Sequence, residues 1–203
     1  MNPRTPLRSA GLFTLVYLAL LAGSLYFGNE YARLLLPLYR WELDLWSQDY
    51  QIQSLLLGDD HGENVVALSL LTKYSVIGGR VVPPGIGISC STLIGHVLQA
   101  PLLVLSLVFA WPAATHRLRL AQFCCAIPFL LLVELLDVPL VLLGSVRDLL
   151  IANLAAENDT FMVGWMNFLN GGGRPALSLF AAMLAVVCSR YVIPDQSRKS
   201  ICH

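Results

Sequence analysis

The chain has 203 residues, of which 56% are hydrophobic and 13% are charged, and its formal net charge is zero. The charged fraction is about half that of a typical soluble domain, and the mean hydropathy is +0.66. This composition predicts an integral membrane protein. It argues against a nucleic-acid partner, because phosphate backbones are bound by clustered Lys and Arg residues.

The N-terminal segment, residues 1–27, combines a short polar tip with an apolar run from Gly11 to Phe27. This run is close to the roughly 20 residues that a helix needs to cross a bilayer. Arg4 and Arg8 before the run would also suit a secretory signal peptide, but no small-x-small cleavage site follows. We therefore expect an uncleaved anchor as the first span.

Residues 28–90 are predicted to form an extracytoplasmic region with two parts. Tyr31–Trp46 has apolar residues near helical spacing and aromatic residues suited to the headgroup level. It predicts an amphipathic helix on the membrane surface, broken at Pro37; continuation of the first span is the alternative. Residues 50–82 alternate apolar with polar and predict a small antiparallel β meander that ends at Pro83-Pro84-Gly85. So small a sheet buries little surface, so we expect it to lean on the membrane, on the helix before it or on a partner protein.

Residues 91–192 are predicted to contain three further spans, and residues 193–203 a basic cytoplasmic tail. The three apolar runs are Ser91–Trp111, Leu120–Leu143 and Pro175–Val192. The predicted fold class is therefore membrane α-helical: a four-helix transmembrane bundle with a small extracytoplasmic antiparallel β meander between the first and second spans.

A polar outer loop at 144–174 is expected between the third and fourth spans. Apolar periodicity predicts helices around Val146–Leu154 and Phe161–Leu169. The sequence Asn170-Gly-Gly-Gly-Arg174 then breaks the chain. Asn158-Asp-Thr160 matches a glycosylation sequon, which matters only in a host that glycosylates.

The distribution of Lys and Arg predicts the orientation. Ten of the thirteen acids fall in the two long loops, together with six of the thirteen basic residues. The other seven basic residues lie on three short segments and are Arg4, Arg8, Arg117, Arg119, Arg190, Arg198 and Lys199. We therefore expect both termini to be cytoplasmic and the β meander to lie outside.

The third span carries two acids, Glu134 and Asp137, three residues apart and therefore on one helical face. At 1.5 Å per helical residue, His96 of the second span would lie level with Asp137, and Gln99 level with Glu134. We interpret these four residues as an intramembrane polar cluster that clamps two helices together. A proton relay or substrate cavity is the alternative, and the small number of ligands argues against a metal site.

A second group of polar residues lies in the meander. Asp59, Asp60, His61 and Glu63 could bind a cation, but glycines flank them, and a charged hairpin tip is the usual outcome of this pattern. We therefore predict no metal and no cofactor.

Cys90 is a candidate nucleophile at the outer mouth of the second span. A thiol becomes reactive when a neighbouring cation or base lowers its pKa. Candidate helpers expected at the same membrane face are Arg147, His96 and Arg174. The alternative is a small residue at the start of a helix.

The Cys-Ser pair at 90–91 and the segment Pro139–Arg147 resemble, in their placement, parts of the exosortases, which are cysteine transpeptidases of bacterial envelope protein sorting. The chain has fewer spans than those enzymes, and no His follows Arg147 before the tail. Its whole layout is more similar to the small membrane proteins encoded beside exosortases, the exosortase H-associated family. The matching features are GGRVV (Gly78–Val82), STLIGHVLQ (Ser91–Gln99) and the NGGGR break.

This resemblance implies a multi-pass protein of the bacterial inner membrane that assists envelope protein sorting. We expect an accessory protein without enzymatic activity, which presents its outer module to another membrane protein such as an exosortase or its substrate. Membrane lipid is the other expected partner, and nucleic acid is not. The alternatives are a Cys-dependent membrane peptidase or transpeptidase with Cys90 as nucleophile, and a small transporter or proton relay that uses Glu134 and Asp137.

Overall fold

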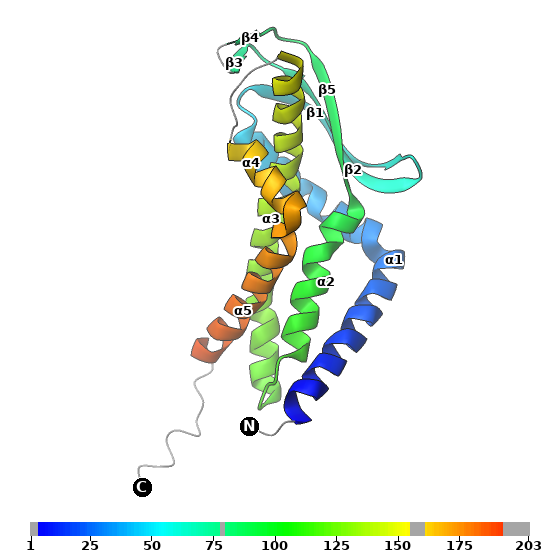
Figure 1. Ribbon diagram of the computed structural model, residues 1–203, viewed down its shortest axis with the longest axis vertical. Helices are drawn as coiled ribbons and strands as arrows, with labels where there is room; N and C mark the ends of the chain where they lie inside the picture. Colours follow the sequence, from blue (N-terminus) through cyan, green and yellow to red (C-terminus); the bar gives the residue numbers. More distant parts are fainter. Residues whose placement is uncertain (1–3, 78–79, 155–160, 193–203) are drawn as a thin grey trace. The chain divides into compact units, whose positions relative to one another are not determined.

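A computed structural model describes residues 4–77, 80–154 and 161–192 (Figure 1). Within these residues the chain is mostly helical, with strands between the first and second helices. The helices are α1 (Arg4–Trp46), α2 (Ile94–Ala110), α3 (His116–Leu154), α4 (Phe161–Phe168) and α5 (Arg174–Val192), with a π-helical turn η1 (Leu169–Gly173) before α5. The strands are β1 (Tyr50–Asp60), β2 (Glu63–Thr72), β3 (Ser75–Ile77), β4 (Arg80–Val82) and β5 (Gly87–Leu93).

Among the described residues, three helical segments are long and apolar enough to cross a membrane: Ser9–Trp46, His116–Asn153 and Phe161–Val192. The apolar helix α2 has 17 residues, at the lower limit for a span. Large apolar side chains on these helices are exposed, which suits lipid tails rather than water; examples are Leu15, Leu25, Phe27, Ile127 and Phe180. These features indicate a multi-pass membrane protein.

The chain forms two compact units, each drawn from separate stretches of sequence. The helical unit contains α1 up to Ser24, the parts of α2 and α3 between Ala100 and Val133, and α5 from Pro175. Its core is built mostly from small residues, which let helix backbones approach closely, as is usual between membrane helices. The core residues are Ala100, Val104, Val108, Ala126, Val133, Ala181, Ala182 and Ala185.

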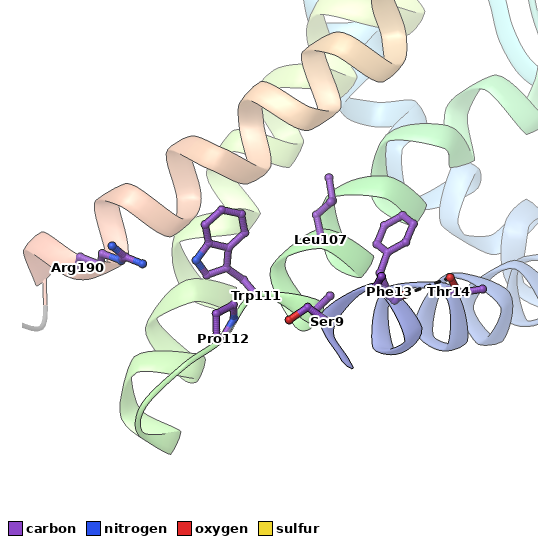
Figure 2. A pocket seen from close by; sticks show the side chains of 9 residues that line it. Ser9, Phe13, Thr14, Leu107, Trp111, Pro112 and Arg190 are labelled. Atoms are coloured by element: carbon purple, nitrogen blue, oxygen red, sulfur yellow. Dashed lines mark hydrogen bonds between the residues drawn. The ribbon is translucent and has the colours of Figure 1, made fainter. Parts of the chain in front are cut away.

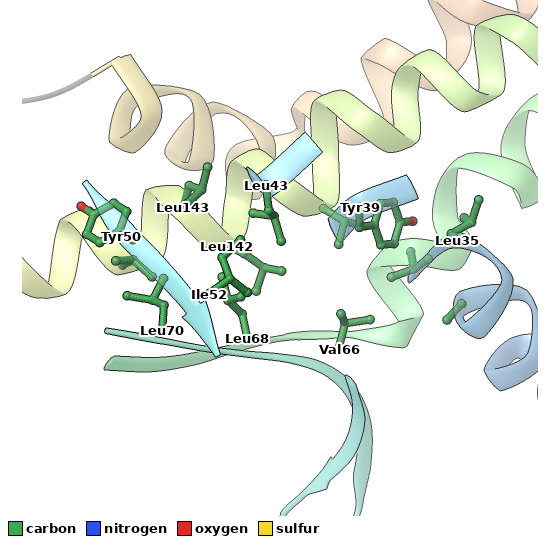
Figure 3. Packing of buried hydrophobic residues seen from close by; sticks show 14 of the residues in the cluster. Leu35, Tyr39, Leu43, Tyr50, Ile52, Val66, Leu68, Leu70, Leu142 and Leu143 are labelled. Atoms are coloured by element: carbon green, nitrogen blue, oxygen red, sulfur yellow. The ribbon is translucent and has the colours of Figure 1, made fainter. Parts of the chain in front are cut away.

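The second unit contains Leu25–Gln99 and Glu134–Arg174, and so holds the strands. Figure 3 shows Ile52 of β1 and Leu68 of β2 packed towards Leu142 of α3, with Tyr39 and Leu43 of α1 beside them. All five side chains are buried. Of the expected supports, the helix before the sheet is confirmed, and the C-terminal part of α3 is a second support that was not expected.

The predicted break of the Tyr31–Trp46 helix at Pro37 is wrong, because α1 runs from Arg4 through this proline to Trp46, which matches the alternative of a continued first span. Pro37 is exposed, whereas Leu35, Tyr39 and Leu43 are buried in the core. A proline inside a helix removes one hydrogen bond and crowds the preceding turn. The packing of the buried face outweighs that local cost.

The first hairpin matches the predicted alternation: β1 pairs antiparallel with β2, from Tyr50 opposite Thr72 to Asp60 opposite Glu63. The predicted end of the sheet is wrong, because β5 follows and pairs antiparallel with β2, giving the strand order β1-β2-β5. β3 and β4 form a separate two-stranded sheet. The described residues therefore form two small sheets instead of one meander.

Thr72 explains why the chain returns to the sheet after the two prolines. Its hydroxyl donates to the carbonyl of Pro83 at 2.8 Å and accepts from the amide of Ile86 at 3.0 Å. Gly85 lies between them with φ +90°, a conformation that glycine adopts without strain. Since β5 then runs to Leu93, helix α2 begins at Ile94 rather than at the predicted Ser91.

The region predicted as an outer loop at 144–174 is largely helical. Helix α3 carries on from the predicted third span through Val146–Leu154 without a loop, and α4 occupies the second predicted helix. The predicted break is confirmed at η1, where Gly172 has φ +110°. The sequon at 158–160, the Gly78-Gly79 part of the GGRVV motif and the tail 193–203 lie outside the described residues.

Replacing Gly144 of α3 with alanine is expected to destabilise the protein by about 1–3 kcal/mol. A Cβ at Gly144 would lie 2.7 Å from the carbonyl oxygen of Met162 and 2.8 Å from the Cβ of Met166. The first of these atoms is a backbone atom and the second is attached directly to the backbone. Neither can move away by a change of side-chain rotamer, so helix α4 itself must move. Gly164→Ala is the matched control, because its Cβ would meet nothing within 4 Å.

Thermal unfolding of both variants in detergent checks this expectation. The control should be neutral or slightly stabilising, since alanine favours a helix over glycine by roughly 0.5–1 kcal/mol. Equal stability of the two variants would mean that α3 and α4 do not approach this closely.

Candidate functional site

A buried polar cluster lies between α1, α3, η1 and the start of α5 in the second unit. Its first part is Glu134 of α3, which is 1% exposed. Tyr39 donates a hydrogen bond to one carboxylate oxygen at 2.6 Å, and Tyr31 donates to the other at 3.0 Å. The two tyrosines are eight residues apart on α1, a little more than two helical turns, so both can reach the same carboxylate of α3.

The second part of the cluster is an ion pair between Asp137 of α3 and Arg174 at the start of α5. The Nε atom of Arg174 lies 2.9 Å from each carboxylate oxygen of Asp137. The Nη1 atom of the same guanidinium donates to Asn170 at 3.0 Å. Both members of the ion pair are at least 94% buried, so each charge is neutralised by its partner rather than by water.

The π-helical turn η1 explains how an arginine reaches this position. Gly172 bends the chain between α4 and α5, and Asn170 and Arg174 then bond to each other across the turn. On the preceding helix, the indole nitrogen of Trp165 donates to the carbonyl of Leu136 at 2.7 Å. The NGGGR sequence therefore serves to bring a cation onto the acidic face of α3.

Among the described residues, the hydrogen bonds of Glu134 and Asp137 do not include the predicted partners Gln99 and His96. The acids bond instead to Arg174 and to the two tyrosines. Helix α2 begins three residues later than expected because β5 precedes it. His96 and Gln99 therefore lie nearer to the start of their helix than the apolar run indicated. His96 and Gln99 are half-buried, and His96 lies within electrostatic range of Arg174.

The sequence did contain a signal for these partners. Tyr31 and Tyr39 share a face with buried leucines of α1, and Arg174 directly precedes the fourth span. Aromatic residues near span ends usually indicate the headgroup level. A tyrosine hydroxyl can also donate a hydrogen bond to a buried acid, as both tyrosines do here.

Cys90 lies on β5, and its thiol is directed to the backbone of α3, with Sγ 3.5 Å from the carbonyl oxygen of Leu142. Burial raises the pKa of the Cys90 thiol to about 12. The proposed helper Arg147 forms an ion pair with Asp49 at 3.4 Å. The structure therefore gives this thiol a carbonyl acceptor, whereas activation of a nucleophile requires a cation or base that favours the thiolate.

Cys90 is expected to react with a water-soluble maleimide on the order of a thousandfold more slowly at pH 7.5 than an ordinary exposed thiol, because the thiolate is the reacting form. A folded pKa above the ordinary value means that the thiolate appears only as the pH rises towards 12. The matched control is Ser89→Cys, an exposed neighbour on the same strand. Both are measured after Cys124, Cys125, Cys188 and Cys202 have been changed to serine. Fast labelling of Cys90 would show an activated thiol.

The residues proposed as an alternative cation site form the tip of the β1–β2 hairpin. The amide of Gly62 donates to the Oδ1 atom of Asp59 at 2.9 Å, and His61 has φ +55°. The side chain of Ser91 donates to Asp60 at 3.3 Å. In the part of the chain that the structure describes, no group of three metal-ligating side chains comes together. These contacts are those of a charged hairpin turn.

No family model matches the sequence, and no curated protein or solved structure matches it either.

Proposed function

We propose that the chain is an integral membrane accessory protein that displays a small outer module, formed by strands β1 to β5, to another membrane protein. The observation that carries this proposal is the exposure of apolar side chains on the strands. Tyr74 is 69% exposed, Val76 61% and Val81 54%, all in or beside the β3–β4 pair. Grouped apolar side chains on a water-facing surface are typical of a protein contact.

The way the sheet is held supports this proposal. One face of β1 and β2 is buried against α1 and α3, while the tip of their hairpin is exposed from Asp59 to Asn64 and extends away from α4 (Figure 1). Rigid support by two helices fixes the orientation of the module, and this lowers the entropy lost when a partner binds.

The polar cluster also supports a structural rather than a chemical role. Both oxygens of Glu134 and both oxygens of Asp137 accept hydrogen bonds from neighbouring side chains. Buried carboxylates that are hydrogen-bonded at both oxygens stabilise one arrangement of the helices. The cluster therefore acts as a clamp that joins α1 and α3 to Arg174 within the second unit.

The partner proposed on the resemblance described above is an exosortase-type sorting enzyme or its substrate in a bacterial inner membrane. The test uses the full chain, co-expressed with the exosortase of the same genome and purified by a tag on either protein. Tyr74→Ser combined with Val76→Ser should reduce co-purification at least tenfold. Gln48→Ala, at another exposed position of the same unit, should leave it unchanged. Failure of the unaltered chain to co-purify would overturn the proposed partner.

The same assay separates the two alternatives. A buried acid bonded to two tyrosine hydroxyls also suits a proton relay, so a relay predicts loss of function in the double variant Glu134→Gln and Asp137→Asn even where partner binding persists. A cysteine peptidase predicts loss of function in Cys90→Ala. If both variants co-purify at the level of the unaltered chain and sorting is intact, the relay and the peptidase are excluded and the accessory role is supported.

A further inference from the structure

The helical unit contains an open cleft of about 520 Å³, within the range of roughly 300–1,000 Å³ that is usual for ligand pockets. It lies between the N-terminal part of α1, the C-terminal end of α2 and the C-terminal end of α5 (Figure 2). This cleft is remote in sequence from the polar cluster, and neither the clamp nor the outer module uses it.

The lining of the cleft is apolar along its walls and basic at one side. Phe13 of α1 and Leu107 of α2 are apolar residues of the lining, and Figure 2 shows both side chains directed into the space between the helices. Arg190 of α5 is the charged residue of the lining, and no carboxylate belongs to the described lining. The cleft therefore favours a ligand with a long apolar part and a negative charge.

Arg190 is exposed, and among the described residues it has no ion pair or hydrogen-bond partner. Arg119, at the same ends of α2 and α3, is different: its guanidinium donates to the carbonyl of Phe109 and lies 5.2 Å from the ring centroid of that residue. Of these two arginines, Arg190 is the one placed to receive an anion at the cleft.

Trp111, at the end of α2, indicates the depth of this site in the membrane. Its indole nitrogen is buried and has no acceptor among the described residues, and the ring lies beside Pro112 at the cleft (Figure 2). Tryptophan settles at the boundary between headgroups and acyl chains.

We propose that this cleft binds one anionic phospholipid, with an acyl chain against Phe13 and Leu107 and the headgroup phosphate at Arg190. Basic pockets between membrane helices are recognised sites for anionic headgroups. The positive-inside distribution of charge assigns this end of the helices to the cytoplasmic leaflet, where anionic lipids give a negative surface potential. A bound lipid would hold α1 to the ends of α2 and α5.

The test is native mass spectrometry of the full chain in detergent, titrated with phosphatidylglycerol and with phosphatidylcholine of identical acyl chains. The unaltered chain should prefer phosphatidylglycerol about fivefold, the attraction expected of one arginine near an anionic headgroup. Arg190→Gln should abolish the preference. Leu107→Trp, which fills the cleft, should weaken binding of both lipids. Arg117→Gln is the control, because Arg117 is exposed in the first turn of α3 and does not line the cleft.

Thermal unfolding shows which variants are folded, and Ala110→Leu replaces Leu107→Trp if the larger side chain prevents folding. Equal binding of the two lipids by the unaltered chain, or an undiminished preference in Arg190→Gln, would overturn the proposal. Displacement of phosphatidylglycerol by inorganic phosphate alone would also overturn it, because the cleft would then be an anion site without a lipid.

Discussion

Replacing Arg174 with leucine is expected to destabilise the protein by about 3–5 kcal/mol, which is the usual cost of leaving one member of a buried ion pair without its partner. Asp137 is 3% exposed, and water therefore cannot solvate its charge in place of the guanidinium. The variant also removes the bond from Arg174 to Asn170. The measurement is the free energy of unfolding in detergent micelles.

A double-mutant cycle isolates the ion pair from the other effects of the substitution. Asp137→Leu alone should also be strongly destabilising, whereas Arg174→Leu combined with Asp137→Leu should recover much of the loss, because two apolar side chains can then pack together. The control is Arg33→Gln, which breaks the exposed pair of Arg33 with Glu30 and should cost less than about 1 kcal/mol. Additive effects in the cycle would contradict direct contact between Asp137 and Arg174.

Replacing Tyr39 with phenylalanine is expected to destabilise the protein by about 1–3 kcal/mol, because the acceptor that remains is a buried acid. The hydroxyl of Tyr39 lies 2.6 Å from Glu134, and both residues are buried. Phenylalanine keeps the ring and its packing, so the loss reports the hydrogen bond. Unfolding in detergent again provides the measurement.

Two further variants set the scale for this result. Tyr31→Phe should have a smaller effect, because its bond to Glu134 is longer, at 3.0 Å, and partly exposed. Tyr26→Phe should have no effect, because Tyr26 is 82% exposed on α1. Combining Tyr39→Phe with Glu134→Leu should cost less than the sum of the two single changes. An unchanged stability of Tyr39→Phe would mean that Glu134 does not depend on this donor.

Features that depend on neighbours in the sequence were predictable. The apolar run at 175–192 marked α5, the alternation after Tyr50 marked the β1–β2 hairpin, and the glycines at 171–173 marked the break at η1. Each of these rests on a local cause: a run long enough to span a membrane, a repeat of two residues per strand, or a backbone conformation that glycine favours.

Features that depend on distant contacts were decided by the tertiary structure alone. β5 is a strand because β2 offers it an edge, and α1 passes through Pro37 because the packing of Tyr39 and Leu43 outweighs a lost hydrogen bond. The acids of α3 could be recognised as buried from their place in an apolar run, but Tyr31 is 103 residues from Glu134. No sequence spacing specifies a partner at that distance, because it is the packing of whole helices that sets which side chains meet.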